Sequence, residues 1–532
     1  MSTAIRPPCD EAVIRAGEAA APCQRSTERW VLAAAILGSS MAFIDGSVVN
    51  LALPQLQDEM GATAVATQWV VEAYALLLSA LLLVGGALGD QFGRRRVFAL
   101  GTGLFAAASV ACGLAPDVGW LIGARAAQGA GGALLVPGSL AIISASFRES
   151  DRGRAIGIWS GFSAMSAGLG PVIGGWLVEH LSWRWAFLVN APLAVAVVAI
   201  AVLRVPESRD EQAAPGLDWP GVVLATMGLG GLVFGLIESA TRGLGDPVIV
   251  ASLVVGLAGI AGFVLVERRS PHPMMPLGLF ASRAFTGANV LTLFLYAGLG
   301  AVFFFLPFNL IQVQGYSATA AGAALAPFIG IMFVLSRWSG GLVDRFGGRG
   351  PLVIGPCIAA AGFAGLAVPG IGGTYWTTFF PGIVVMGLGL AVAVAPLTTV
   401  VMGAVPPRSV GTASGINNAV SRTAGLLAIA VLSVVVSATF NARLDAALDG
   451  LALPPAARTE VDLERPKLAG ARLPADLRPA TARQVRAAID DAFVAAFRQV
   501  ALAAALLALA SAVVAWCTID GLRQRANRSR EG

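Results

Sequence analysis

Long apolar runs alternate with short polar segments along almost the whole chain. A helix needs about 20 apolar residues to cross the hydrocarbon core of a bilayer. On that rule we count fourteen sufficient runs, and we predict an all-α polytopic membrane protein. The predicted spans lie near 30–53, 67–89, 96–115, 118–145, 154–178, 183–204, 217–238, 247–266, 285–311, 318–343, 351–369, 375–402, 411–437 and 492–516.

One polar turn occurs twice between these runs. GALGDQFGRRR begins at Gly86 and GGLVDRFGGR begins at Gly340, so that Asp90 corresponds to Asp344, 254 positions later. The two copies have the same orientation, which is typical of a parallel duplication about an axis along the membrane normal. We therefore predict two six-helix halves with two additional helices between them, a 6 + 2 + 6 arrangement.

These patterns divide the chain into five parts. They are a cytoplasmic N-terminal tail (1–29), an N-terminal six-helix domain (30–204), two inserted helices with linkers (205–284), a C-terminal six-helix domain (285–516) and a cytoplasmic C-terminal tail (517–532). A segment at about 441–491, rich in Pro, Arg, Asp and Ala, interrupts the second domain. We expect it to be a loop on the outer face, and its pattern leaves open a mobile cap or a passive connection.

Composition excludes several classes of protein. The chain is 56% hydrophobic and 13% charged, whereas ordinary soluble domains carry roughly 25% charged residues. Its two histidines and five cysteines show no metal-ligand spacing, so we predict neither a metal site nor a disulfide framework. No Walker motif is present, which argues against ATP-driven transport, and we do not expect an enzyme.

Arginines concentrate in alternate short loops, for example Arg94, Arg95 and Arg96. By the positive-inside rule, these loops face the cytoplasm. The first 29 residues contain no apolar core of signal-peptide length. Because the number of spans is even, we expect both termini to be cytoplasmic, in a multi-pass protein of the inner (plasma) membrane.

Three ionisable residues fall deep inside predicted spans. With a rise of ~1.5 Å per residue, Asp45, Glu72 and Arg125 lie roughly 13, 8 and 10 Å from the outer ends of spans one, two and four. Charges at such depth are costly and usually face a bundle interior or an aqueous cavity. One interpretation is a proton site, where a carboxylate binds a proton when buried and releases it when Arg125 approaches. The other is a permanent ion pair that holds the spans together.

Two further stretches carry candidate features. On span thirteen, Asn418 and Arg422 are four residues apart and share a helix face, with Asn417 beside them. These side chains either line a cavity or bond to neighbouring helices. On span five, GLGPVIGG contains Pro171, which bends a helix, and small residues that allow close packing. An ordinary kinked helix is the alternative for this stretch, whose glycines are Gly168, Gly170, Gly174 and Gly175.

Five motifs together resemble a known family. They are IDGSVVNLALP (44–54), GALGDQFGRRR (86–96), LIGARAAQGAGGALLVPG (121–138), GLGPVIGG (168–175) and WRWAFLVNAP (183–192). The chain resembles the major facilitator superfamily, and within it the 14-spanner drug:H+ antiporter family, from Trp30 to about Val436. The resemblance supports Asp45 and Arg125 as motif positions. It also implies that GLGPVIGG is the antiporter motif of exporters, with Ser166 replacing a leading glycine.

The two polar turns resemble the cytoplasmic gate of this superfamily. Each aspartate could meet a helix N-terminus of the opposite half, where the helix dipole favours an anion. The arginines could pair with Glu149 or Asp151 when the cytoplasmic face closes, or they could serve only to fix topology. The residues assigned to this predicted gate are Gly86, Asp90, Gly93, Arg94, Arg95, Asp344, Gly347 and Arg349.

The resemblance implies proton-coupled export of amphipathic, hydrophobic or cationic drugs or metabolites by alternating access. The expected partners are the small-molecule substrate, protons and the lipid bilayer, without nucleic acid. We expect a functional monomer with no cofactor, powered by the proton gradient; a periplasmic adaptor stays an open question. The alternatives are a dedicated exporter of one metabolite or antibiotic, and a non-transporting membrane sensor or structural protein.

Overall fold

The computed structural model describes residues 25–209, 218–270, 273–406, 409–451 and 453–520. Within these ranges fourteen helices are long and apolar enough to span a bilayer, which confirms the predicted number. The described residues contain helices, turns and loops but no strand, so the all-α prediction is also confirmed. Most of the two predicted tails and part of the linker after the sixth span lie outside the described residues.

The N-terminal half consists of six spans. They are α2 (Arg25–Met60), α3 (Ala64–Phe92), α4 (Arg94–Gly113), α5 (Val118–Ser146), α6 (Glu149–His180) and α8 (Asn190–Arg204), the last preceded by the short α7 (Trp185–Leu188). Side chains cap two of the spans: Thr63 accepts a hydrogen bond from the N–H of Ala66, and Asp117 accepts one from the N–H of Trp120. Within this half, α5 packs against α3 and α4, and α2 packs against α6.

The inserted pair and the C-terminal half follow. Their helices are α9 (Trp219–Arg242), α10 (Pro247–Arg269), η1 (Leu277–Ala281), α11 (Arg283–Phe308), η2 (Asn309–Val313), α12 (Ala318–Ala324), α13 (Ala326–Gly340), α14 (Leu342–Phe346), α15 (Arg349–Leu366), α16 (Phe379–Gly403), α17 (Val410–Asp449), α18 (Pro455–Glu464), η4 (Arg465–Gly470) and α19 (Pro479–Thr518). Helix α9 packs on α3 of the first half and on α17 of the second. The inserted pair therefore lies beside the junction of the two halves.

The bundle has two chemically different ends. The repeated turns lie at one of them, which we call the arginine end because it carries Arg94–Arg96, Arg345 and Arg349. Both turn glycines have positive φ, +110° at Gly93 and +72° at Gly347, a region that residues with a side chain rarely adopt. The duplicated motif thus forms the same kind of chain reversal in both halves.

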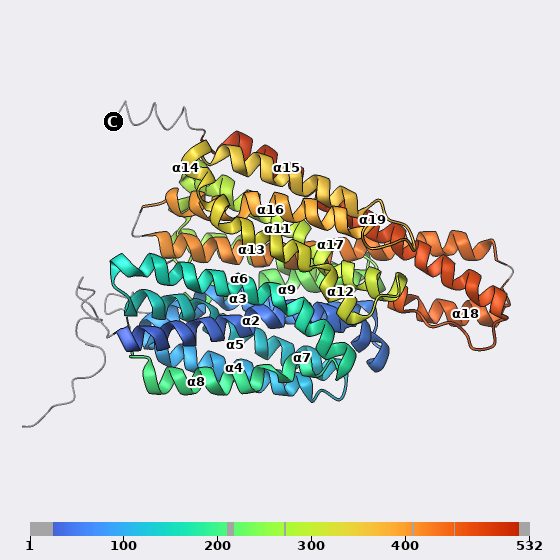
Figure 1. Ribbon diagram of the computed structural model, residues 1–532. Coiled ribbons are helices and arrows are strands. Elements are labelled where there is room, and N and C mark those ends of the chain that lie inside the picture. The colour runs from blue at the N-terminus through green and yellow to red at the C-terminus, as the bar shows by residue number, and fades with distance from the viewer. Residues whose placement is uncertain (1–24, 210–217, 271–272, 407–408, 452, 521–532) are drawn as a thin grey trace, which may run out of the picture.

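At the opposite end, which we call the cap end, the structure differs from one prediction. The segment expected as a loop at about 441–491 is largely helical, because α17 continues to Asp449, α18 and η4 follow, and α19 already begins at Pro479. Alanine, leucine and arginine are strong helix formers, and the apolar residues Leu444, Leu448 and Ile489 are buried against the rest of this region. In Figure 1 the ends of α17, α18 and α19 project beyond the other helices.

The two halves meet along a few helices. In Figure 1 the N-terminal half and the C-terminal half form adjacent layers, with α6 next to α12 and α13. Contacts between α6 and α12, α6 and α13, and α2 and α11 join the halves. The features described below are built on these helices and on the core of the N-terminal half.

Candidate functional site

A buried ion pair lies at the centre of the N-terminal half. Nη1 of Arg125 on α5 is 2.6 Å from Oδ2 of Asp45 on α2, and both side chains are almost inaccessible to solvent, at 1% and 0% exposure. The guanidinium also donates from Nε to the carbonyl oxygen of Val70 on α3, at 2.9 Å. The structure therefore brings together two of the three charged residues that were expected in this layer.

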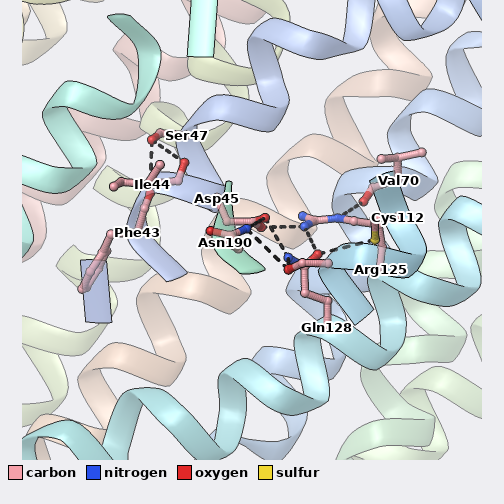
Figure 2. A network of polar contacts seen from close by, with 10 residues as sticks. Phe43, Ile44, Asp45, Ser47, Val70, Cys112, Arg125, Gln128 and Asn190 are labelled. Atoms are coloured by element: carbon pink, nitrogen blue, oxygen red, sulfur yellow. Dashed lines mark hydrogen bonds and ion pairs between the residues drawn. The ribbon is translucent and has the colours of Figure 1, made fainter. Parts of the chain in front are cut away.

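Amides complete the coordination of this pair. Gln128 donates to Oδ1 of Asp45 at 2.7 Å and accepts from Arg125 at 2.6 Å, while Asn190 on α8 donates to Asp45 at 3.2 Å. The guanidinium carbon of Arg125 lies 4.2 Å from the ring centre of Tyr74. Figure 2 shows the side chains converging from different helices. This buried ion-pair network joins α2, α3, α5 and α8, and each charge depends on the others for its solvation.

For one of the two amides, Gln128, the spacing along the helix is a signal that could have found it. Gln128 lies three residues after Arg125, and side chains at that spacing share a helix face. Asn190 belongs to the WRWAFLVNAP motif, but its distance in sequence gave no indication that it would reach Asp45. Only the packing of α8 against α2 places it there.

Glu72 is buried but lies outside the network. Its side chain is 0% exposed, and neither carboxylate oxygen has a hydrogen-bond partner among the described residues. It sits on α3 between Trp69 and Leu76 at helical spacing, and those residues pack with side chains of α9 and α17. The expected three-residue layer is therefore divided: Asp45 and Arg125 meet, whereas Glu72 lies on the side of α3 that faces the junction of the halves.

The polar residues of span thirteen have different environments. Asn417 donates to Oγ1 of Thr292 at 2.7 Å and to Asn289 at 3.2 Å, so it joins α17 to α11. Asn418 is exposed and donates to the carbonyl oxygen of Ser414 in its own helix. Arg422 is half-buried, one turn before Leu426, which packs against α3. For Asn417, the helix-bonding interpretation is the one that the geometry supports.

The GLGPVIGG stretch forms a close contact between helices of both halves. A Cβ atom added at Gly174 would overlap Val48 of α2, and one added at Gly175 would overlap the main chain of Ala318 in α12. In the reverse direction, a Cβ at Gly322 of α12 would overlap the carbonyl of Pro171. We call this contact the glycine seal. It closes the junction of the halves toward the cap end, because α6 reaches that end after Gly175.

Polar contacts extend the glycine seal on both sides. Ser166, which departs from the family pattern, donates to Oγ of Ser40 on α2 at 2.7 Å and is buried there. Nearer the cap end, Glu179 of α6 accepts a hydrogen bond from the N–H of Thr319 at 2.9 Å, in the first turn of α12. A carboxylate at a helix N-terminus is stabilised by the helix dipole.

A cavity of about 860 Å³ lies between the halves, next to the glycine seal. Its wall includes Gly46 and Ser47 of α2, together with Phe303, Phe328 and Met332 of the C-terminal half. The lining is mainly apolar and continues along α6 and α13 toward the arginine end, as far as other lining residues, Gly157 and Ser339. The cavity is therefore closed toward the cap end by the glycine seal and extends toward the arginine end.

At the arginine end, the first copy of the predicted gate is bound within its own half. Asp90 pairs with Arg94 at 2.7 Å. Among the described residues, this ion pair is the side-chain contact of Asp90, and it does not reach the helix N-terminus expected in the opposite half. Glu207, from the segment after α8, accepts from the N–H of Arg95 at 3.0 Å and lies 3.5 Å from the side chains of Arg95 and Arg96. Glu207 was missed in the sequence because no spacing rule connects it to this turn.

The second copy differs from the first. Asp344 is exposed and makes no ion pair with any described residue, while the guanidinium carbon of Arg349 lies 3.8 Å from the ring centre of Trp516. Gly86, at the start of the first copy, lies beside Pro137 of α5. Among the described residues, the ion pairs that these gate residues make join partners within the first half.

Comparison with known proteins agrees with this architecture. Residues 35–429 match the family model that describes the Major Facilitator Superfamily. The puromycin resistance protein of Streptomyces alboniger is 37% identical over 425 residues, which cover 78% of this chain and 83% of that protein. The tetracenomycin C resistance and export protein of Streptomyces glaucescens is 34% identical, covering 76% and 75% of the two chains. The multidrug resistance protein Stp of Mycobacterium tuberculosis is 36% identical, covering 80% and 78%.

Solved structures show the same fold. A bacterial homologue of the human lysosomal transporter Spinster, in an inward-facing and unoccupied conformation, matches with a TM-score of 0.65 at 18% identity, covering 93% of this chain and 99% of that one. Such low identity is informative about the fold alone. Together with the sequence relatives and the fourteen spans, it leads to one conclusion: the chain belongs to the major facilitator superfamily of membrane transporters, and to its 14-spanner type.

Proposed function

We propose that this protein exports amphipathic or hydrophobic compounds across the inner membrane in exchange for protons, by alternating access. The observation that carries the proposal is the position of α2. Gly46 and Ser47 form part of the cavity wall, and Asp45, the preceding residue, is held in the buried ion-pair network. Protonation of Asp45 would change its bonds to Arg125, Gln128 and Asn190, and α2 would transmit that change directly to the cavity.

The cavity lining supports an apolar substrate. Among the named residues of its wall, Phe303, Phe328, Met332 and Phe333 offer aromatic and thioether surface. The cavity volume is within the range of about 300–1,000 Å³ that drug-sized ligands occupy. Because the cavity lies between the halves of one chain, we propose that a monomer is sufficient for transport.

The relatives support export, but their names are compatible with either a narrow or a broad range of substrates. The Streptomyces proteins are named for single antibiotics, which favours a dedicated exporter, whereas Stp is named a multidrug resistance protein. A panel of compounds separates these alternatives. We expect purified protein in vesicles to accumulate puromycin, tetracenomycin C or ethidium only when a pH gradient is imposed.

Two results of that panel would contradict the proposal. Equal uptake after the gradient is collapsed would remove proton coupling. If no compound is moved by a protein that is folded and correctly inserted, the sensor or structural alternative becomes the better one. Vesicles without protein supply the background.

The orientation of the bundle leads to a topology prediction. We place the arginine end in the cytoplasm, because basic residues are retained on that side. A reporter fused after Gly370, at the cap end, should therefore be exported, and one fused after Arg349 should stay cytoplasmic. Alkaline phosphatase activity and green fluorescence measure the two locations. The opposite pattern at either site would refute the orientation.

A further inference from the structure

The projecting cap is a folded extension of the C-terminal half. Helices α17 and α19 each have 40 residues, which corresponds to about 60 Å at 1.5 Å per residue, twice the thickness of a bilayer core of about 30 Å. Their outer parts enclose buried Leu444, Leu448, Val485 and Ile489. The cap is therefore a continuous extension of two membrane-spanning helices of the C-terminal half.

Ion pairs fix α18 to the end of α17. Arg458 pairs with Asp445 at 3.0 Å and with Asp449 at 3.1 Å. Arg465 pairs with Asp445 at 2.5 Å and with Asp462 at 2.6 Å. A shared network of this kind restrains each side chain more than an isolated pair does, so the segment after α18 begins from a fixed position.

The segment 465–472, which we call the latch, crosses to the other half. Nη2 of Arg472 lies 2.6 Å from Oδ1 of Asp58 at the end of α2, and it also donates to the carbonyl oxygen of Asp58 at 2.9 Å. Beside this exposed pair, the buried side chain of Gln57 donates to the carbonyl oxygen of Lys467 at 3.1 Å and accepts from Gln312 of η2 at 2.9 Å. The side chain of Arg472, the carbonyl of Lys467 and the side chain of Gln312 thus join the end of α2 to the cap and to the C-terminal half.

Leu468 adds an apolar contact at the same place. It has φ +54° and ψ −125°, a conformation that residues with a side chain rarely adopt. Its side chain faces a small pocket whose wall combines Val65 and Gln68 of α3 with Phe304 of α11 and Val436 of α17. A strained residue persists where the surrounding contacts hold it, and here those contacts come from both halves.

Glu464 stabilises the turn that presents these groups. It accepts hydrogen bonds from Nζ of Lys467, at 2.7 and 2.8 Å, and from the N–H of Arg472 at 3.0 Å. Burial alone would raise the pKa of Glu464, but these hydrogen bonds hold it below the usual value. The carboxylate is therefore ionised at neutral pH, where the turn needs it.

We propose that the latch holds the two halves together at the cap end, and that it must leave α2 and α3 before the cavity can open on that side. The inference rests on the proposed alternating access, because only relative motion of the halves would separate α2 from the cap. An exposed ion pair contributes little stability by itself, so this contact can break during turnover. The latch thus sets the balance between the sealed state seen here and a state open at the cap end.

Accessibility of the sealed side of the cavity tests the proposal without a substrate. Leu51 lines the cavity and is 1% exposed, so a Leu51→Cys reporter should react slowly with an impermeant maleimide applied from the cap side. Arg472→Ala and Leu468→Ala should each raise that rate several-fold. Arg478→Ala is the matched control, because Arg478 is exposed at the start of α19 and makes no ion pair with any described residue.

The exchanged pair Asp58→Arg/Arg472→Asp should restore slow labelling, since it rebuilds the contact with opposite charges. Protein without Leu51→Cys measures labelling of the native cysteines. Equal rates in Arg472→Ala, Leu468→Ala and the unaltered reporter protein would overturn the latch. Because labelling requires no transported compound, this result is distinct from a failure of the proposed export.

A cross-link supplies the opposite perturbation. In Asp58→Cys/Arg472→Cys, a short bifunctional thiosulfonate should reduce export at least tenfold, and a reducing agent should reverse the loss. Each single cysteine variant treated in the same way should export normally. Full export by protein shown to be cross-linked would also overturn the proposal.

Discussion

Replacement of Asp45 by asparagine should reduce export driven by a pH gradient to the level of vesicles without protein. The amide has nearly the same shape as the carboxylate and can still bond to Gln128 and Asn190, but it cannot take up and release a proton. Downhill exchange of substrate, which needs alternating access but no net proton movement, should continue. Uptake with an imposed gradient and counterflow without one measure the two activities separately.

The same replacement removes the counter-ion of Arg125, which is 1% exposed. A buried charge that has lost its partner costs about 3–5 kcal/mol, so part of any loss could arise from instability. The double variant Asp45→Asn/Arg125→Gln removes both charges and should recover thermal stability without recovering proton-driven export. If the double variant pumps normally, the buried ion-pair network is structural and the assignment of Asp45 is refuted.

Glu72→Gln is the matched control for this experiment. Glu72 is equally buried, but it lies outside the network and its oxygens have no partner among the described residues. We expect weaker effects on coupling than those of Asp45→Asn. Loss of coupling in Glu72→Gln, with coupling retained in Asp45→Asn, would place the proton site on α3 at the junction with α9 and α17.

Gly175→Ala should produce the second large effect, a nearly complete loss of export. The added Cβ would overlap the main chain of Ala318, and a backbone contact cannot yield by a change of rotamer. Overpacking of this kind typically costs 1–3 kcal/mol, and here the cost falls on the state in which the cap end is closed. Gly322→Ala makes the same test from α12, where the added atom would overlap the carbonyl of Pro171.

Gly103→Ala on α4 supplies the control, because a Cβ at that glycine would meet open space. It should fold, insert and export as the unaltered protein does. Export and thermal stability measured on all three variants separate loss of the glycine seal from a general defect. Full export by Gly175→Ala would show that the sealed state does not require close contact between α6 and α12.

Much of the architecture was predictable because the bilayer restricts what a sequence can do. Every backbone polar group in the hydrocarbon must be bonded within its own helix, so each apolar run of sufficient length becomes a span. The duplicated turns were also predictable, because Gly93 and Gly347 each lie between two apolar runs. In the structure both glycines have the positive φ that reverses the chain. The depth of Asp45 and Arg125 followed from simple counting along their helices.

The outer segment shows where pattern reading was insufficient. A membrane-spanning helix can continue beyond the membrane surface when its sequence still favours a helix. The residues after 437 do favour one, so α17 continues to Asp449. Their apolar positions, such as Leu444 and Leu448, are buried by the start of α19, which is distant in sequence. The latch on α2 depends on the same long-range contact.

The sequence by itself determined the number of spans, their repeat and the depth of the charged residues, whereas the tertiary structure decided which of these residues meet. A membrane helix that is apolar on most faces carries little information about its rotation, and packing against neighbouring helices sets that rotation. This is why Asp45 meets Arg125, Gln128 and Asn190, while Glu72 turns toward α9 and α17.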